Sequence, residues 1–184
     1  RDTVRDHAHG LNRLNVYPVP DGDTGTNMAR TLDAVVAEMD TTDVDDHDGT
    51  CDAISYGSLM GARGNSGVIL SQIMRGFAGT LKEHVDVQGA KFAEALQAAA
   101  TGAYDAVLKP IEGTILTVCR ESADAARAAA DAGGTLAEVA RAARAAGKVA
   151  LDNTPEQLAV LKDAGVVDAG GAGFLLLLDS LLYV

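Results

Sequence analysis

The segment Asn15-Val16-Tyr17-Pro18-Val19-Pro20-Asp21-Gly22-Asp23-Thr24-Gly25-Thr26-Asn27-Met28 carries a proline-containing arm into two aspartates and then into the start of a helix. Pro18 and Pro20 fix φ and push the residues before them toward extended conformations. Residues 15–20 are therefore expected to form a stiff, non-helical strut. This strut places the aspartates that follow it directly before a helix.

The two aspartates supply the chemistry of this segment. Asp21 and Asp23 are separated by a glycine that allows a tight turn, and both offer hard oxygen ligands. Such ligands suit Mg²⁺, which commonly bridges one or two protein carboxylates to substrate phosphates. Thr24 or Thr26 is expected to cap the following helix, whose free N–H groups favour an anion. The segment therefore predicts a cation and phosphate site.

Two other interpretations of the Asp-Gly-Asp-Thr-Gly-Thr run are a plain turn with a helix cap and a phosphorylated-aspartate loop. Asp and Gly favour turns because they tolerate unusual φ values. The run also matches the nucleophile loop of haloacid-dehalogenase-like phosphotransferases. That loop should follow a buried strand, whereas here prolines occupy the strand position and helical patterns fill the rest of the chain. The context favours metal and phosphate binding without a covalent phosphoaspartate.

The rest of the chain indicates an all-α fold. Sustained alternation of polar and apolar residues is absent, aromatic residues are only 4% of the chain, and alanine-rich stretches recur at helical spacing. The polar stretch around His7 and His9 is expected at the surface, and an acidic loop is expected over residues 40–48. Helices are predicted over residues 26–38, 52–60, 66–84, 89–109, 115–132, from 135 onward, over 154–164, and after 173.

Many glycines gather in four segments between the predicted helices, at 22 and 25, at 61–67, at 113 and at 170–173. In an up-and-down arrangement every second loop lies at the same end. These segments are therefore expected to converge on one ligand. Their backbone N–H groups at helix N-termini suit phosphate oxygens.

Several polar residues in these loops have both a structural and a binding interpretation. Ser66 is expected to cap the helix that follows it, with its hydroxyl also available to phosphate, and Arg63 is either a phosphate contact or a solvated loop residue. Thr114 is most simply a helix cap, with nucleotide contact as a second role. Asp168 is either the cap of the final helix or a polar contact to a ligand. Thr135 and Thr154 open predicted capping boxes.

Composition limits the partners and the location. The formal net charge of −11 argues against a nucleic-acid or acidic-membrane partner, because phosphate backbones require Lys and Arg. Cys51 and Cys119 are expected to be buried free thiols. Since no signal segment or long apolar run occurs, no stable membrane insertion is expected and the cytoplasm is the expected location. Residues 1–184 are interpreted as a single domain and as a fragment of a longer chain.

Four ordered blocks of the sequence carry a family resemblance. Residues 14–28, 61–72, 109–118 and 164–171 resemble the N-terminal nucleotide-binding domain of the fatty-acid kinases, which are relatives of the ADP-binding subunit of dihydroxyacetone kinase. The resemblance implies a barrel of about eight antiparallel amphipathic helices. It also implies that ATP or ADP and two Mg²⁺ ions are held by loops at one end.

The resemblance further implies roles for individual residues. The metal ligands would be Asp21, Asp23 and Asn15, where Asn15 stands in place of a third aspartate of the dihydroxyacetone kinase branch. Thr24 stands in place of a histidine of that branch, and both changes agree with the fatty-acid branch. The implied nucleotide contacts are Thr24, Gly25, Thr26, Asn27, Asn65, Ser66, Thr114, Ile115, Asp168, Ala169 and Gly170.

The implied reaction moves the γ-phosphoryl group of ATP to the carboxylate of a fatty acid. A separate fatty-acid-binding carrier protein would present this acyl substrate, and the full-length protein is a candidate homodimer. No protein nucleophile is expected, because positioning and charge neutralisation are sufficient. Two alternatives stay open, namely the nucleotide subunit of a dihydroxyacetone-type kinase, or a non-catalytic helical module that binds nucleotide or metal.

Overall fold

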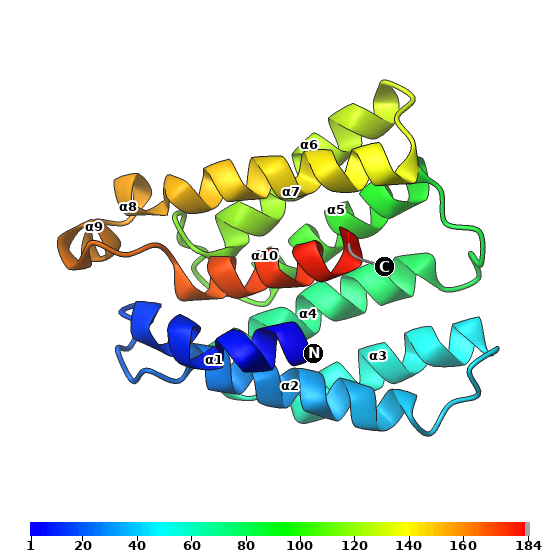
Figure 1. Ribbon diagram of the computed structural model, residues 1–184, viewed down its shortest axis with the longest axis horizontal. Coiled ribbons are helices and arrows are strands. Elements are labelled where there is room, and N and C mark those ends of the chain that lie inside the picture. The colour runs from blue at the N-terminus through cyan, green and yellow to red at the C-terminus, as the bar shows by residue number, and fades with distance from the viewer. Residues whose placement is uncertain (183–184) are drawn as a thin grey trace.

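The computed structural model describes residues 1–182, and over these residues the chain forms helices and no strands. Tyr183 and Val184, which end the terminal apolar run, lie outside the described residues. The all-α prediction is confirmed (Figure 1). The helices are α1 (Asp2–Leu14), α2 (Thr24–Met39), α3 (His47–Gly61), α4 (Gly64–Leu81), α5 (Gly89–Asp105), α6 (Ile115–Asp131), α7 (Leu136–Asp152), α8 (Thr154–Gln157), α9 (Ala159–Ala164) and α10 (Ala169–Leu182).

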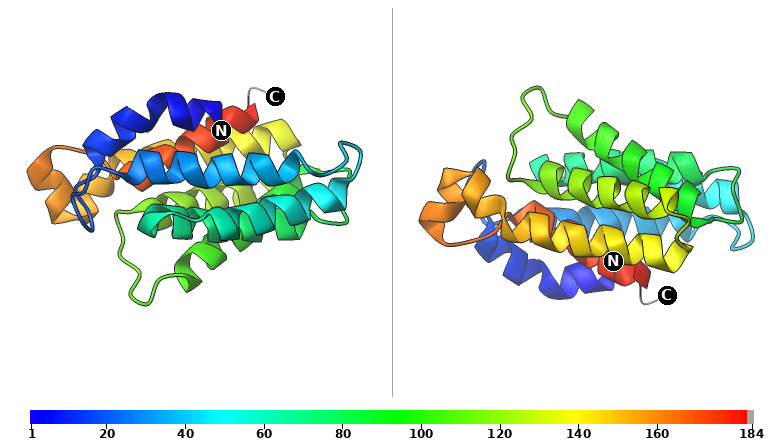
Figure 2. Two further views of the ribbon diagram at one scale, coloured as in Figure 1. Left: turned by 90° about the horizontal axis from the view of Figure 1, so that it is seen from below. Right: turned by 90° about the horizontal axis from the view of Figure 1, so that it is seen from above.

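The eight long helices form an antiparallel ring. Each of α1 to α7 packs against the next helix in the chain, and α10 closes the ring by packing against both α7 and α1. Helix α10 also contacts α2 and α6, so it lies at the centre of the packing (Figures 1 and 2). The short helices α8 and α9 belong to the connection from α7 to α10. The predicted up-and-down arrangement is therefore present.

Small side chains let these helices pack closely. The larger core cluster combines aromatic and aliphatic residues such as Phe92, Leu96 and Leu116 with many fully buried alanines of α5, α6 and α7. A second cluster around Met28 and Leu70 joins α1, α2 and α4. Alanine at helix contacts lets backbones approach because it adds little side-chain bulk. The alanine-rich composition is therefore the basis of the compact ring.

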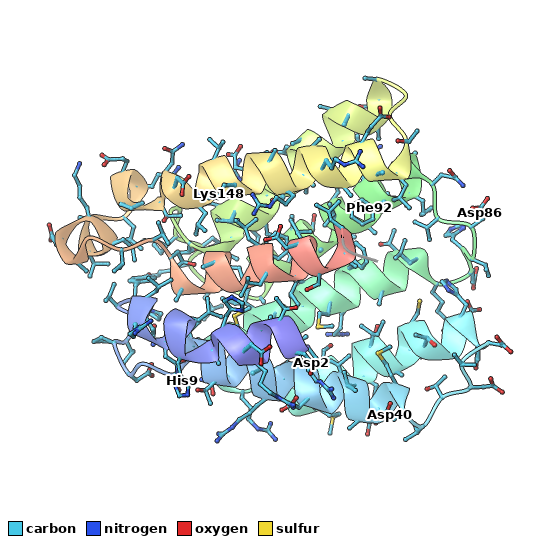
Figure 3. All side chains as sticks on the ribbon, viewed as in Figure 1. Asp2, His9, Asp40, Asp86, Phe92 and Lys148 are labelled. Carbon is cyan, nitrogen blue, oxygen red and sulfur yellow. The ribbon has the colours of Figure 1, made fainter. Side chains whose placement is uncertain are left out.

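The two ends of the barrel differ in charge. The connection between α2 and α3 and the adjoining first turn of α3 carry five aspartates, at 40, 43, 45, 46 and 48. Figure 3 shows Asp40 and Asp86 at the right-hand end, away from α8 and α9. The acidic loop predicted over residues 40–48 is thus confirmed in position, although α3 begins already at His47. These five aspartates lie at the opposite end of the barrel from the starts of α2, α4, α6 and α10.

Both cysteines, Cys51 and Cys119, are buried and free, as predicted. Burial raises the pKa of the Cys119 thiol to about 12, so this thiol stays protonated at neutral pH. In the part of the chain that the structure describes, every helix is too short or too polar to cross a membrane.

Several predicted helix boundaries were wrong. Helix α1 was not predicted, since its mostly polar sequence hides the two widely spaced core residues Val4 and Leu11. Helix α3 begins five residues before the predicted Asp52, with Asp46 as its N-cap. The single helix predicted over 154–164 is two helices that meet at Leu158, where the backbone is extended.

The predicted glycine loop at 170–173 is also wrong, because these residues form the first turns of α10. Helical glycine is unfavourable locally, but here the absent side chains let neighbours come close. A Cβ atom at Gly171 would lie 2.8 Å from Cγ2 of Val118, and one at Gly173 would lie 2.6 Å from Sδ of Met28. Tertiary contact therefore overrides the local preference for a loop.

Two glycines of α4 provide a test of this packing. A Cβ atom at Gly76 would lie 2.5 Å from the backbone oxygen of Ala98 on α5, whereas one at Gly79 would meet nothing within 4 Å. We predict that Gly76→Ala lowers the free energy of unfolding by about 1–3 kcal/mol, because backbone atoms must move. The matched control Gly79→Ala should raise it by about 0.5–1 kcal/mol. Urea denaturation measures both, and equal effects of the two changes would contradict close packing between α4 and α5.

Candidate functional site

Four long helices, α2, α4, α6 and α10, begin at the same end of the barrel. Their first residues follow the loops that end at residues 23, 63, 114 and 168. This is the left-hand end of Figure 1, which also carries α8 and α9. The first N–H groups of a helix have no partner within that helix, and its N-terminus carries a partial positive charge. The convergence of the glycine-containing segments at one end is therefore confirmed, with the 170–173 segment inside a helix.

The aspartate arm lies between α1 and α2. Residues 15–23 are non-helical, as predicted, and the Tyr17–Pro18 peptide bond is cis. Asn15 is buried, and its side-chain Nδ2 donates a hydrogen bond to Oδ1 of Asp21 at 2.7 Å. Asp21 is exposed, and Asp23 is the half-buried N-cap residue of α2, without a side-chain capping bond. The prediction that Thr24 or Thr26 caps this helix was wrong, since both lie inside it.

An asparagine that the sequence did not single out holds this arm in place. Nδ2 of Asn12 donates to Oγ1 of Thr26 at 2.9 Å, and the backbone N–H of Thr26 donates to Oδ1 of Asn12 at 3.1 Å. These two bonds join the last turn of α1 to the first turn of α2. Gly25 allows the contact, because a Cβ atom there would lie 2.3 Å from the backbone oxygen of Ala8. The ends of the aspartate arm are therefore clamped together.

The start of α4 is tied to α2 through Asn27 and Thr31. Both residues are buried, and Oγ1 of Thr31 accepts a hydrogen bond from the backbone N–H of Arg63 at 3.3 Å. A Cβ atom at Gly64 would lie 2.3 Å from Nδ2 of Asn27, and Gly64 has a positive φ of 59°. Only glycine fits this turn without strain. The turn between α3 and α4 therefore sits directly over α2.

Asn65 and Ser66 lie in the first turn of α4, exposed and half-buried respectively. The prediction that Ser66 caps this helix was wrong, because α4 begins two residues earlier with Arg63 as its N-cap. Arg63 is exposed, and its guanidinium donates to the backbone oxygen of Ala62 at 3.0 Å. Its side chain lies on the solvent side of the turn.

Thr114 caps α6, as predicted. Its hydroxyl accepts a hydrogen bond from the N–H of Leu116 at 3.3 Å and donates to the backbone oxygen of Ile111 at 2.8 Å. Thr135 likewise forms the predicted capping box with Glu138. The capping box predicted at Thr154 is absent, because Asn153 is the N-cap there and makes no side-chain capping bond.

Asp168 joins three segments of the site end. Its Oδ2 accepts a hydrogen bond from the N–H of Gly171 at 2.7 Å, and its carboxylate also interacts with the N–H groups of Ile115 and Gly170. Its own N–H donates to Oγ1 of the fully buried Thr154 at 3.1 Å. Asp168 thus takes the capping role, and it links the starts of α6 and α10. Ala169 and Gly170 are buried beneath it.

Burial raises the pKa of Asp168 to about 6, although the backbone N–H groups of Gly171, Ile115 and Gly170 act in the opposite direction. The side chain is almost inaccessible to water, so ionising it is unfavourable despite these donors. At neutral pH the carboxylate therefore places a desolvated negative charge between two helix N-termini. Helix dipoles favour a charge of this sign.

The arm offers a donor set that fits Mg²⁺. Asn15 uses its NH₂ group on Asp21, which leaves its amide oxygen and the second oxygen of Asp21 as acceptors, and Asp23 follows two residues later in the arm. Two carboxylates with phosphate oxygens and water are a common Mg²⁺ environment. Across residues 1–182 the structure brings no three His, Cys, Asp or Glu side chains together as a metal site. A cation here would depend on the ligand's own oxygens.

Two hollows of about 340 Å³ each open on the sides of the barrel. One lies between α1 and α10 and the other between α6 and α7. Neither is lined by Asn15, Asp21 or Asp23. The two hollows are therefore separate from the aspartate arm.

Comparison with known proteins agrees with this architecture. Residues 18–183 match the model of the DAK2 domain. The chain belongs to the DAK2 domain family. Protein YloV of Bacillus subtilis strain 168 is 45% identical over 176 residues, which is 96% of this chain and 32% of that protein. An uncharacterized protein of Staphylococcus epidermidis strain ATCC 12228 is 45% identical over 179 residues, 97% of this DAK2 domain and 32% of that protein.

Among solved structures, the crystal structure of the dihydroxyacetone kinase of C. freundii in its native form has the same fold. The TM-score is 0.71 at 17% sequence identity, and the match covers 99% of this chain and 32% of that chain. At this identity the likeness concerns the fold alone. The DAK2 domain described here spans about one third of the length of these relatives.

The buried carboxylate of Asp168 predicts a particular pH dependence of stability. Its folded pKa of about 6 lies above the ordinary 3.8, so between about pH 4 and pH 6 the folded state binds more protons than the unfolded state. Stability from this group is therefore full at low pH and falls as pH rises. Asp168→Asn removes the titration, so its stability relative to wild type should increase by on the order of 3 kcal/mol between pH 4 and pH 7.

Urea denaturation of both proteins at several pH values measures this difference. Asp163→Asn, which changes an exposed aspartate of α9, is the matched control and should show no such trend. A relative stability of Asp168→Asn that decreases with rising pH would show instead that capping by the charged carboxylate dominates.

Proposed function

We propose that this DAK2 domain is the ATP-binding domain of a kinase that uses Mg²⁺. One observation carries the proposal: four helix N-termini converge at the end of the barrel where Asp21 and Asp23 lie. Helix N-termini favour phosphate oxygens, and a paired carboxylate favours the cation that accompanies a nucleotide. A chain with a net charge of −11 requires such a cation to bind a polyphosphate.

In this proposal Asp21, Asp23 and the amide oxygen of Asn15 hold the cations, and the first turns of α2, α4, α6 and α10 surround the nucleotide. Mg²⁺ would offset the negative charge that is shared by the transferred phosphoryl group and the leaving group. The domain itself would contribute position and electrostatic stabilisation. A covalent phosphoaspartate is unnecessary, because the acceptor attacks the γ-phosphorus directly.

We infer that the acceptor is the carboxylate of a fatty acid presented by a separate carrier protein. Asn15 and Thr24 support this branch of the family, since the dihydroxyacetone kinase branch has an aspartate and a histidine there. A carboxylate is already an ionised nucleophile at neutral pH and needs no general base. The product would be an acyl phosphate, and the acceptor would reach the nucleotide from the barrel end.

Nucleotide binding should depend on the aspartate pair. We predict that the double variant Asp21→Ala plus Asp23→Ala weakens ADP binding in the presence of Mg²⁺ by at least about 100-fold, since two charged ligands are lost. Calorimetric titration with ADP, with and without Mg²⁺, measures the effect. In wild type, omitting Mg²⁺ should weaken binding to a similar extent.

The matched control removes the same charge from the opposite end of the barrel. Asp43 and Asp45 are exposed in the loop between α2 and α3, so Asp43→Ala plus Asp45→Ala should leave the ADP affinity unchanged. Unchanged ADP binding in the Asp21 and Asp23 variant would eliminate the metal bridge. Absence of nucleotide binding by the wild-type domain would eliminate the kinase assignment.

The acceptor is tested with a longer protein that contains this domain. We predict that labelled phosphate passes from ATP to a fatty acid loaded on its lipid carrier, and that dihydroxyacetone on its own carrier protein is not labelled. Chromatography of the labelled products measures both reactions side by side. Labelling of the ketose alone would replace the fatty-acid assignment with a dihydroxyacetone-type kinase.

A further inference from the structure

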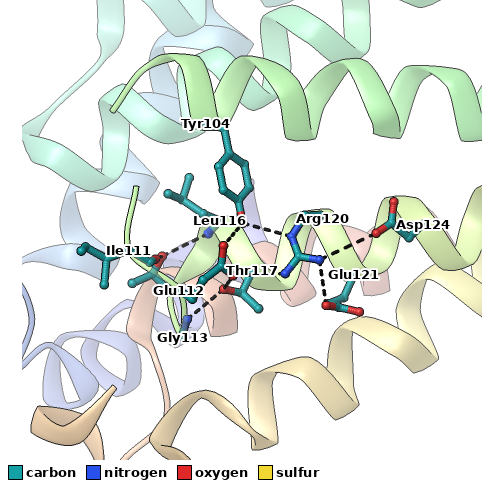
Figure 4. A network of polar contacts seen from close by, with 10 residues as sticks. Tyr104, Ile111, Glu112, Gly113, Leu116, Thr117, Arg120, Glu121 and Asp124 are labelled. Carbon is teal, nitrogen blue, oxygen red and sulfur yellow. Dashed lines mark hydrogen bonds and ion pairs between the residues drawn. The ribbon is translucent and has the colours of Figure 1, made fainter. Parts of the chain in front are cut away.

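A network of polar side chains surrounds Glu112, immediately before the N-terminus of α6 (Figure 4). Oε1 of Glu112 accepts a hydrogen bond from the hydroxyl of Tyr104 at 2.8 Å. Its Oε2 accepts from the hydroxyl of Thr117 at 2.6 Å and from Nη2 of Arg120 at 3.1 Å. Nε of Arg120 also donates to the Tyr104 hydroxyl at 3.2 Å. The network connects the end of α5, the loop and the first two turns of α6.

The network fixes the backbone conformation of the turn that precedes α6. Oγ1 of Thr117 donates to Glu112 and also accepts the N–H of Gly113 at 2.8 Å. Gly113 has a φ of 80°, and a Cβ atom there would lie 3.0 Å from the backbone oxygen of Thr154 and from the side chains of Gln157 and Leu158. Thr114, the capping residue, follows directly. Glu112 therefore holds the turn against the connection that leads to α10.

Three side chains donate hydrogen bonds to the carboxylate of Glu112. An acidic residue is needed here because it can accept all three. A carboxylate has two acceptor oxygens, whereas a glutamine would replace one acceptor with a donor facing Tyr104 or Thr117. Partial burial raises the pKa of Glu112, but hydrogen bonds from Thr117, Tyr104 and Arg120 bring it below its ordinary value. Glu112 is therefore ionised at neutral pH.

The ion pair of the network is partly exposed. We therefore expect it to order the turn before α6 and to add little to the free energy of unfolding of the whole domain. The side chains of Glu112 and Arg120 are 51% and 41% exposed, and exposed ion pairs contribute little to the free energy of folding. Arg120 also pairs with Glu121 at 3.0 Å. A carboxylate beside a phosphate site would repel the phosphate unless a cation neutralised it. Arg120 offsets part of this charge, since its guanidinium also contacts Glu121 and Asp124.

We propose that Glu112 is a positioning residue for the nucleotide: through Tyr104, Thr117 and Arg120 it holds the Gly113–Thr114 turn so that the N-terminus of α6 faces the phosphates. This inference rests on the proposed nucleotide-binding function and extends it to residues outside the predicted contacts. The network acts on the nucleotide through the turn, since Thr117 joins Glu112 to the backbone N–H of Gly113. Cation binding at Asp21 and Asp23 is independent of it.

The test uses Glu112→Gln and Tyr104→Phe. Both variants should raise the Kd for ADP in the presence of Mg²⁺ by about tenfold, which is the loss of one hydrogen bond to a charged group. Amide hydrogen exchange over residues 111–117 should become faster by a similar factor. Exchange in α7, and the Kd for Mn²⁺ alone as a probe of the aspartate arm, should stay at their wild-type values.

Three further variants separate positioning from a general loss of structure. Tyr56→Phe removes a hydroxyl from an exposed tyrosine of α3 and should leave the ADP affinity and the exchange rates unchanged. Thr117→Val should weaken ADP binding as Glu112→Gln does, whereas Thr117→Ser keeps the hydroxyl and should bind ADP like wild type. The pair assigns the effect to the Thr117 hydroxyl, and unchanged amide exchange in α7 shows that its loss is local to the turn.

Failure of this inference is distinct from failure of the proposed function. A wild-type Kd for ADP in the presence of Mg²⁺ in both Glu112→Gln and Tyr104→Phe would overturn the positioning role and leave the proposed nucleotide site standing. Lack of ADP binding by the wild-type domain would overturn both. Faster exchange throughout the barrel would also overturn the inference, because Glu112 would then be a residue of global stability.

Discussion

Close contact between helix backbones is the constraint on which the rest of the structure depends. Where α1 meets α2, a Cβ atom at Gly25 would lie 2.3 Å from a backbone oxygen, and Gly76 and Gly147 are equally crowded between α4 and α5 and between α6 and α7. Interiors at this separation have little room for large side chains, which agrees with the low aromatic content. Within residues 1–182, the buried hydroxyl of Ser122 has no hydrogen-bond partner, and it would lie 2.3 Å from a Cβ atom at Gly147.

Side chain to backbone hydrogen bonds complete the end of the barrel where the helices are joined by irregular chain. Asn12 binds the start of α2, Thr31 binds the turn before α4, and Thr154 binds the start of α10. Asp168 joins α10 to α6. Each bond satisfies a backbone group that would otherwise be unpaired at a buried helix end. These bonds order the end of the barrel at which α2, α4, α6 and α10 begin.

Acidic side chains differ in their surroundings at the two ends of the barrel. Five aspartates gather at and near the connection between α2 and α3, far from the helix N-termini. At the other end, Asp21 and Asp23 lie at or near the surface, where a cation can reach them. Asp168 is buried, and its carboxylate interacts with the backbone N–H groups of Gly171, Ile115 and Gly170. The carboxylate of Glu112 is matched by Arg120. Each of these four carboxylates is therefore either accessible to solvent or bonded to backbone N–H groups or to an arginine.

The sequence by itself determined the helical class, the non-helical arm with its two aspartates, and the caps at Thr114 and Thr135. These features depend on interactions within a few residues, such as helical periodicity, fixed proline φ angles and N-cap hydrogen bonds. Only the tertiary structure decided that residues 170–173 are helical, that Ser66 lies inside α4, and that Thr31, Thr154 and Asn12 hold the site together. Their partners lie on other helices, and which backbone a buried hydroxyl or a glycine meets is set by packing between distant segments.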